Sequence, residues 1–157
     1  MKNIILPFLV VFFLLQSGAC ISQPTKKGKA LVGVFEGRTP CQELAKQLNE
    51  ITIPECIKIK WRLVLYKDST VVNTGTYQLE GFVFRKDNIL KGKWYLTKGT
   101  KADPETIVYQ LDHPLRKPIF LQKGDDNVLF FLDREKKLMV GNRDFSYTLN
   151  RVVDVRY

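Results

Sequence analysis

Cysteine is the residue type of this chain that could take part in the most kinds of reaction, and it occurs three times, as Cys20, Cys41 and Cys56. Cys41 and Cys56 bracket a short helical pattern, and two such thiols form a disulfide in an oxidising compartment. Closing a loop of about 15 residues contributes roughly 3 kcal/mol to stability in the chain-entropy description. The alternative is a Cu(I) site, because thiolates and thioethers suit that soft ion. His113 and Met139 are the remaining candidate ligands, although no motif spacing brings them to the cysteines.

Other groups with catalytic or metal-binding chemistry stand alone in the sequence. His113 is the only histidine, precedes Pro114, and is expected to be a solvated or turn residue rather than a base. Asp125, Asp126 and Asn127 lack the spacing and the final Glu of a calcium loop, and they predict a hairpin turn. The sequence has no G-x-S-x-G, H-E-x-x-H, P-loop or dinucleotide fingerprint. We therefore expect a protein that is not an enzyme.

The first 19 residues have the pattern of a secretory signal peptide. Lys2 is their only charge, and residues 4–15 form an apolar run that is shorter than the about 20 residues needed to cross a bilayer. The small residues typical of a cleavage site follow: Ser17, Gly18 and Ala19. We predict that residues 1–19 are a signal peptide and are removed.

Cys20 follows these small residues directly, as in a bacterial lipobox, where the thiol is acylated and becomes the new N-terminus. Ser17 stands where that motif usually has Leu, so ordinary cleavage that leaves a free thiol is the alternative. Acylation is favoured because an odd cysteine in an exported protein needs a role. More than one acyl chain makes such anchoring stable. Residues 20–29 are then expected to be a flexible, lipid-anchored tether in the bacterial cell envelope, at the outer membrane.

The chain is basic, with a formal charge of +9 that falls to +8 when the signal peptide and its one lysine are removed. The basic residues are spread along the chain rather than clustered. This distribution is typical of a solvated basic surface, and attraction to anionic envelope surfaces is the alternative. An exported protein seldom meets nucleic acid, so we expect none as a partner.

Most of the chain after the tether alternates between apolar and polar residues, with the period of two that is typical of strands. The pattern is clearest in residues 57–66. Their apolar face comprises Ile57, Ile59, Trp61, Leu63 and Leu65. The expected strands are residues 30–37, 57–66, 74–85, 89–97, 107–111, 119–122, 128–132 and 145–153, with a short extra strand at 138–140. Together they predict one domain over residues 30–157.

A single helix is expected near the start of that domain. Thr39 can act as its N-cap with Pro40 at the first helical position, and the helix should end near Asn49. No crossover helices separate the strands, so an all-β antiparallel meander fits best. We expect it to close into a barrel of about eight strands, with a two-sheet sandwich as the alternative. Gly81 and Gly92 predict bends or bulges within the strands.

Aromatic residues on the expected strands bear on whether the barrel is open or filled. A barrel of eight strands either fills its interior with side chains or holds one small ligand. Trp61, Tyr77, Phe82 and Trp94 would line such a ligand cavity. The alternative is that the same residues pack in the core.

The two ends of the expected barrel resemble a known family. Residues 33–41 (GVFEGRTPC) are similar to the first strand and cysteine turn of the N-terminal domain of NlpE-type copper-resistance and envelope-stress lipoproteins. Residues 129–133 and 145–151 are similar to the end of that domain. The resemblance implies a lipocalin-like barrel on a lipid anchor, with a role in copper resistance or the stress response. Leu44 replaces the second cysteine of the family's C-x-x-C pair, so only Cys41 matches its proposed metal thiolates.

The expected function is binding or signalling by a lipid-anchored envelope protein. The expected partners are the membrane, through the lipid anchor, and an envelope protein, and we expect the chain to be a monomer. Copper held by Cys41 and Cys56 is the one cofactor that the resemblance suggests. The alternative function is a lipocalin-like carrier of a small apolar ligand, held by Trp61, Tyr77 and Trp94.

Overall fold

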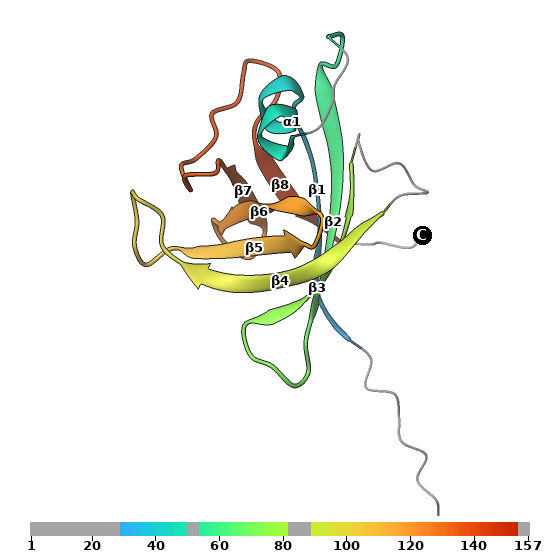
Figure 1. Cartoon of the computed structure of the whole chain (residues 1–157), viewed down its shortest axis with the longest axis vertical. Coiled ribbons are helices and arrows are strands. Elements are labelled where there is room, and N and C mark those ends of the chain that lie inside the picture. The colour runs from blue at the N-terminus through green and yellow to red at the C-terminus, as the bar shows by residue number, and fades with distance from the viewer. Residues whose placement is uncertain (1–28, 50–53, 82–88, 154–157) are drawn as a thin grey trace, which may run out of the picture.

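The computed structural model describes residues 29–49, 54–81 and 89–153, which form a closed antiparallel β-barrel with one short helix (Figure 1). Each strand pairs with its neighbours in sequence, and pairing of β1 with β8 closes the ring. The elements are β1 (Ala30–Pro40), α1 (Gln42–Leu48), β2 (Lys58–Lys67), β3 (Thr74–Glu80), β4 (Leu90–Lys98), β5 (Ile107–His113), β6 (Arg116–Lys123), β7 (Val128–Leu132) and β8 (Thr148–Val152). The predicted all-β barrel is confirmed.

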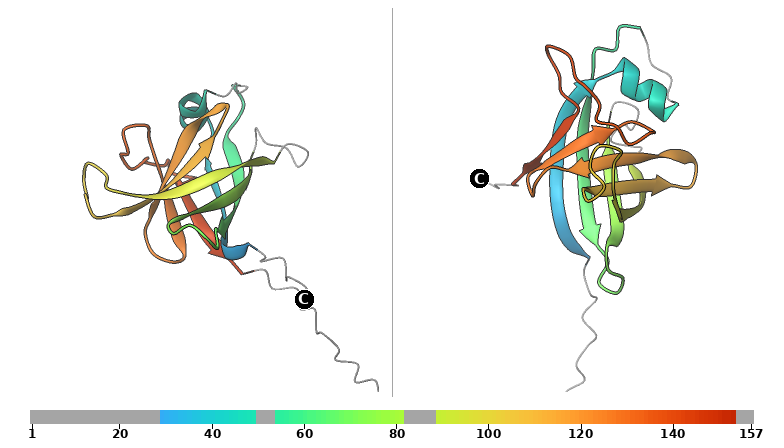
Figure 2. Two further views of the ribbon diagram at one scale, coloured as in Figure 1. Left: turned by 60° about the horizontal axis from the view of Figure 1, so that its bottom comes forward. Right: turned by 90° about the vertical axis from the view of Figure 1, so that its left-hand side faces the viewer.

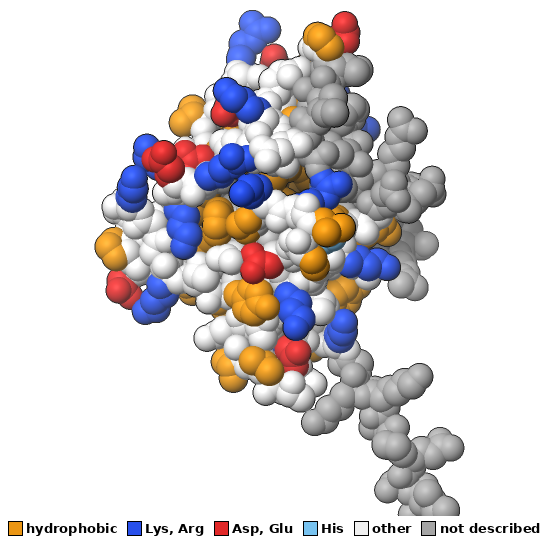
Figure 3. All heavy atoms as spheres, in the orientation of Figure 1, with side chains coloured by type: hydrophobic (Ala, Val, Ile, Leu, Met, Phe, Trp, Pro, Cys, Tyr) orange, Lys and Arg blue, Asp and Glu red, His pale blue; other side chains and the backbone are white. Residues whose placement is uncertain are grey.

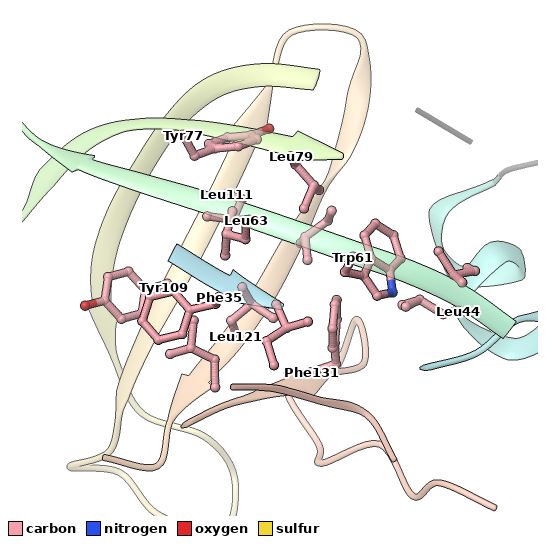
Figure 4. Packing of buried hydrophobic residues seen from close by; sticks show 14 of the residues in the cluster. Phe35, Leu44, Trp61, Leu63, Tyr77, Leu79, Tyr109, Leu111, Leu121 and Phe131 are labelled. Atoms are coloured by element: carbon pink, nitrogen blue, oxygen red, sulfur yellow. The ribbon is translucent and has the colours of Figure 1, made fainter. Parts of the chain in front are cut away.

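Alternation of side chains builds the core, and β2 shows it most clearly. Ile59, Trp61, Leu63 and Leu65 are at most 3% exposed, because they point into the barrel and leave their basic neighbours outside. Ile57 departs from the prediction, since it precedes β2 and is 72% exposed. The inward residues of the other strands complete one cluster that fills the space between the strands (Figure 4).

Two glycines on facing strands make room for large rings in this core. A Cβ atom on Gly75 would lie 2.7 Å from the indole of Trp94, its partner on β4. A Cβ atom on Gly92 would lie 2.7 Å from the ring of Tyr77, its partner on β3. The predicted bulge at Gly92 is wrong, because the β3–β4 register passes through it without a shift. Gly81 follows the end of β3 and lies against the ring of Trp61.

The helix begins two residues later than its sequence predicts. Pro40 is the last residue of β1 and pairs with Lys58, so Cys41 takes the N-cap position and α1 starts at Gln42. Thr39 is fully buried in β1, where its Oγ1 accepts a hydrogen bond from Trp61 Nε1 (2.9 Å). Pairing along β1 and β2 therefore outweighs the local capping signal. The C-terminal end is as predicted, with Asn49 in the left-handed conformation.

Helix α1 and the chain that follows β7 cover one end of the barrel (Figure 2). Leu44 and Ala45 face the core and are buried. Arg134 donates hydrogen bonds from Nε and Nη2 to the carbonyl of Gln47, and from Nη2 to Asn49 Oδ1 (2.8 Å). These bonds satisfy carbonyl and amide oxygens at the end of α1, so they fix the chain after β7 to the helix.

The segment between β7 and β8 is a long connection rather than further strand. β8 begins at Thr148, later than predicted, and the expected strand at residues 138–140 is reduced to one isolated bridge between Leu132 and Leu138. Asn142 Oδ1 accepts hydrogen bonds from the backbone of Asp144 and Phe145, and this polar turn takes Phe145 out of the strand predicted for residues 145–153. The predicted hairpin turn at residues 125–127 lies between β6 and β7, as expected.

Charged residues close the opposite end of the barrel, where β1 begins and β8 ends. The Arg151 guanidinium lies 4.9 Å from the centroid of the Phe35 ring. It donates to the carbonyl oxygens of Val32 (2.9 Å) and Asp126 (2.6 Å). Lys123 pairs with the Asp126 carboxylate at 2.7 Å. Arg151 therefore ties β8 both to β1 and to the turn between β6 and β7.

Candidate functional site

The predicted Cys41–Cys56 disulfide is present, with Cα atoms 5.8 Å apart. Cys41 follows β1 directly and Cys56 comes just before β2, so the adjacent ends of two paired strands bring the sulfurs together. Both cysteines are buried, and Cys41 N donates to the carbonyl of Ile57 (3.3 Å). The bridge therefore pins α1 to the end of the barrel that it covers.

The other predicted copper ligands do not gather around these sulfurs as thiolates would require. The cysteines are bonded to each other, so a Cu(I) thiolate site would need the reduced protein. His113 Nδ1 accepts a hydrogen bond from Leu115 N (3.2 Å) in the β5–β6 turn, and Met139 packs on the core. In the three described ranges, no three of the His, Cys, Asp and Glu side chains are grouped as a metal site.

Three of the four aromatic residues predicted to line a ligand cavity lie inside the barrel. Trp61, Tyr77 and Trp94 are at most 3% exposed. Trp61 packs on Phe131 with ring centroids 5.5 Å apart, and Trp94 packs on Tyr109 at 5.4 Å. Figure 4 shows Trp61 and Phe131 side by side between the strands. These rings fill the interior with contacts to one another.

The buried rings also carry polar atoms into the interior, among them the indole nitrogen of Trp94 and the hydroxyl of Tyr77. Trp94 Nε1 donates to the carbonyl of Tyr66 (3.0 Å). Burial raises the pKa of the Tyr77 phenol to about 12, and the negative charge of Asp112 adds to that shift. The pocket beside Tyr77, under Leu48 of α1, holds about 10 Å³, which is roughly the space of one water molecule. That pocket has no room for an apolar ligand.

A larger hollow lies on the outside of the barrel. This outer groove has a volume of about 490 Å³ and is bounded by the outward faces of β1, β2 and β8 and by the β7–β8 connection. Its lining residues are Glu36, Gly37, Arg38, Lys60, Trp61, Asp144, Phe145, Ser146 and Asn150. The strand register brings these lining residues together, since Glu36 of β1 pairs with Arg62 of β2 on one side and with Asn150 of β8 on the other.

The groove is lined by two cations and two acids, and each acid pairs with a cation that lies outside the lining. Arg38 and Lys60 are direct partners on β1 and β2, and like charges in that position repel each other. The neighbouring cation, Arg62, is neutralised by an ion pair with Glu36. The groove's other acid, Asp144, lies 3.5 Å from Arg143 Nε. Arg38 and Lys60 therefore form a cation pair that no described acid neutralises.

An aromatic ring, that of Phe145, lines the groove together with this cation pair. Phe145 comes from the β7–β8 connection, and its ring lies 5.6 Å from the ammonium of Lys58. Ser146 and Asn150 add a hydroxyl and an amide. Such a surface can hold an anionic group against the cations and an apolar group against the ring.

The sequence alone did not reveal this groove. Arg38 and Lys60 each look like ordinary solvent-facing residues of alternating strands, and Phe145 was assigned to a strand. Only the β1–β2 register and the turn at Asn142 bring the three together. The basic stripe of β2, formed by Lys58, Lys60 and Arg62, was the one available signal.

Two predicted positions lie outside the described residues: the lipidation residue Cys20 and the aromatic Phe82. The predicted signal peptide, residues 1–19, does so as well. Over the described ranges, the search for membrane-crossing helices found none that is both long and apolar enough.

Comparison of the chain with protein-family models, with curated proteins and with solved structures gave no match.

Proposed function

We propose that this protein is a lipid-anchored envelope protein that acts by binding an acidic partner in the outer groove. The observation that carries the proposal is the cation pair of Arg38 and Lys60, which faces a groove of about 490 Å³ without a neutralising acid. An anionic partner would relieve the repulsion between the two cations, and the Phe145 ring would add apolar contact. These are binding groups, so the proposed activity is recognition rather than catalysis.

The place of action follows from the sequence. The signal pattern of residues 1–19 and the small residues before Cys20 support export, acylation and attachment to the outer membrane. The resemblance to NlpE-type lipoproteins supports the same location, and the barrel architecture is compatible with it. We propose an envelope protein with an acidic segment as the partner.

The carrier function is the weaker alternative. It needs open space next to Trp61, Tyr77 and Trp94, and those residues are buried against other core side chains. No feature of the described barrel interior favours an apolar ligand.

The groove is tested by titration with a labelled hexaglutamate peptide, followed by fluorescence anisotropy at low ionic strength. The protein is the chain from residue 20 onward with Cys20→Ser, which keeps it in solution. Arg38→Ala combined with Lys60→Ala should weaken binding about five- to tenfold, as expected for two partly exposed charge contacts. The matched control is Lys91→Ala with Lys93→Ala, which removes two exposed cations from β4.

The two double variants distinguish binding in the groove from general attraction between the basic protein and the acidic peptide. Loss of affinity in the groove variant alone supports the proposal. An equal loss in both variants would mean that only net charge matters, and absence of binding by the parent protein would also reject the groove. Mass spectrometry of the N-terminus tests the anchor separately, since an unmodified Cys20 excludes acylation.

A further inference from the structure

The turn between β2 and β3 exposes two valine side chains to solvent. Val71 is 54% exposed and Val72 is 77% exposed. Turn positions usually hold Gly, Asn, Asp or Ser, because those side chains suit both the backbone and water. The described turn at residues 124–127 follows that rule, with a glycine, two aspartates and an asparagine. The β2–β3 turn is therefore the unusual one at this end of the strands.

Hydrogen bonds within the turn fix the backbone that carries the two valines. Asp68 Oδ1 accepts hydrogen bonds from Thr70 N (2.8 Å), Thr70 Oγ1 (2.7 Å) and Val71 N (3.3 Å). Asn73 takes the left-handed conformation that turn asparagines tolerate, with φ of 60°, and its carbonyl accepts a hydrogen bond from Leu96 N (2.8 Å). The turn is thus a fixed projection with its apolar side chains directed outward.

The same end of the barrel is where the chain enters from its N-terminal segment. Ala30, the first residue of β1, pairs with Lys67 at the base of the turn. Figure 1 shows the start of β1 beside the β2–β3 turn, with α1 at the opposite end, and Figure 2 agrees. Nine peptide units connect Cys20 to Lys29, and they reach at most about 30 Å when fully extended. An acyl group on Cys20 would therefore keep this end close to the bilayer.

Charge at this end suits an anionic lipid surface. Lys29 donates to Thr76 Oγ1 (3.2 Å), which places its ammonium beside the turn, and Lys67 lies at the turn's base. Leu31, 59% exposed, adds apolar surface next to them. Figure 3 shows hydrophobic side chains at the lower edge, where the β2–β3 turn lies, with an acidic side chain beside them and basic side chains above. Apolar groups next to lysines are the pattern of a peripheral membrane contact.

We propose that the β2–β3 turn inserts Val71 and Val72 into the interfacial region of the bilayer that holds the lipid anchor. The inference rests on the proposed lipid anchor at Cys20. It adds a second membrane contact, which fixes how the barrel stands on the membrane. The outer groove and α1 then face a defined direction rather than tumbling on the tether.

The first test measures depth in the membrane with a spin label. The full chain is expressed in a lipoprotein-processing bacterium, purified and reconstituted in phosphatidylethanolamine–phosphatidylglycerol vesicles, after Val72→Cys and attachment of a nitroxide. The matched control is Val140→Cys, which lies on the β7–β8 connection at the α1 end and is 89% exposed. Power-saturation measurements should place the Val72 label in lipid and the Val140 label in water.

The outcomes distinguish the inference from the proposed function. If the protein floats with the vesicles but both labels sit in water, the inference is overturned and the anchor stands. Shielding of the Val72 label without vesicles would mean that a second copy covers the turn, which also overturns the inference. If the protein does not float and Cys20 is unmodified, the proposed anchor fails.

A second measurement does not need the anchor. The chain from residue 20 with Cys20→Ser is sedimented with vesicles that contain phosphatidylglycerol. Val71→Ser with Val72→Ser should lower the partition coefficient on the order of tenfold, from the apolar area removed. Leu138→Ser with Val140→Ser, which removes two exposed apolar residues from the α1 end, should leave it unchanged. Equal loss in both variants, or no binding by the parent chain, overturns the inference.

Discussion

The two ends of this barrel are closed by different means. At one end, α1 lies over the core, held by the Cys41–Cys56 disulfide and by buried Leu44. At the other, Arg151 spans from the Phe35 ring to backbone carbonyls, and no helix among the described residues covers the strands. The covered end relies on apolar contact and a covalent bond, while the charged end relies on hydrogen bonds to one guanidinium. The two ends should therefore respond to different perturbations.

Removing the disulfide should have the largest effect, at the covered end. Cys41→Ala with Cys56→Ala releases a loop of about 15 residues and should lower the free energy of unfolding by about 3 kcal/mol. Guanidinium unfolding followed by tryptophan fluorescence measures the change. Reduction of the parent protein is the control and should give a similar loss. A loss below about 1 kcal/mol in both would show that α1 is held without the bridge.

Alkaline pH should weaken the covered end through Tyr77. The folded-state pKa of about 12 lies above the ordinary tyrosine value of 10.0, so the contribution of the buried phenol to stability is complete below pH 10. It is lost as the pH rises from 10 to 12, by about 2–3 kcal/mol in all. Tyr77→Phe should make the fall in stability over that interval shallower. Tyr95→Phe, on the outward face of β4, is the matched control, and an equal change there would contradict the assignment.

Arg151→Met should weaken the charged end by about 2 kcal/mol. The substitution keeps much of the side-chain length but removes two hydrogen bonds from a charged donor to the carbonyls of Val32 and Asp126. Thermal unfolding measures the loss. Arg143→Met, at a side chain that is 92% exposed, should change stability little. A similar effect of both variants would mean that net charge, rather than the closing contact, is responsible.

Arg134→Ala should have the smallest effect of the four, about 1 kcal/mol. It removes the hydrogen bonds to Gln47 and Asn49 at the end of α1, on the surface of the covered end. Hydrogen exchange should accelerate in α1 and the β7–β8 connection while the β2–β3 pair stays protected. Acceleration throughout the barrel would show that the contact supports the whole fold instead.

Period-two patterning predicted the strands well because each side of a strand meets one environment. It predicted all eight strands, together with a ninth at residues 138–140 that is only an isolated bridge. The disulfide was predicted separately, from two cysteines in an oxidising compartment. The start of the helix was not, because Thr39 and Pro40 carry a local capping signal that the pairing of Pro40 with Lys58 overrides. Local sequence contains no information about that distant partner.

The outer groove was missed for the same kind of reason. Arg38 and Lys60 are 22 positions apart, and their like-charge juxtaposition exists only through the β1–β2 register. Phe145 reaches the groove because Asn142 makes a turn where strand was predicted. Sites that are assembled across strands from individually ordinary residues are hard to see before the register is known.

The closing of the ring has a consequence for how the chain folds. Every pairing except one joins strands that follow each other in sequence, so the meander can assemble hairpin by hairpin, with the longest connections before β2 and before β8. The exception is the seam of β1 with β8, which rests on three residue pairs between Val34–Glu36 and Asn150–Val152 and joins the two ends of the meander. Joining two strands that are far apart in sequence costs more conformational entropy than forming a hairpin, so we expect this seam to form late in folding. Arg151 crosses the seam, and its hydrogen bond to the carbonyl of Val32 should form in that last step.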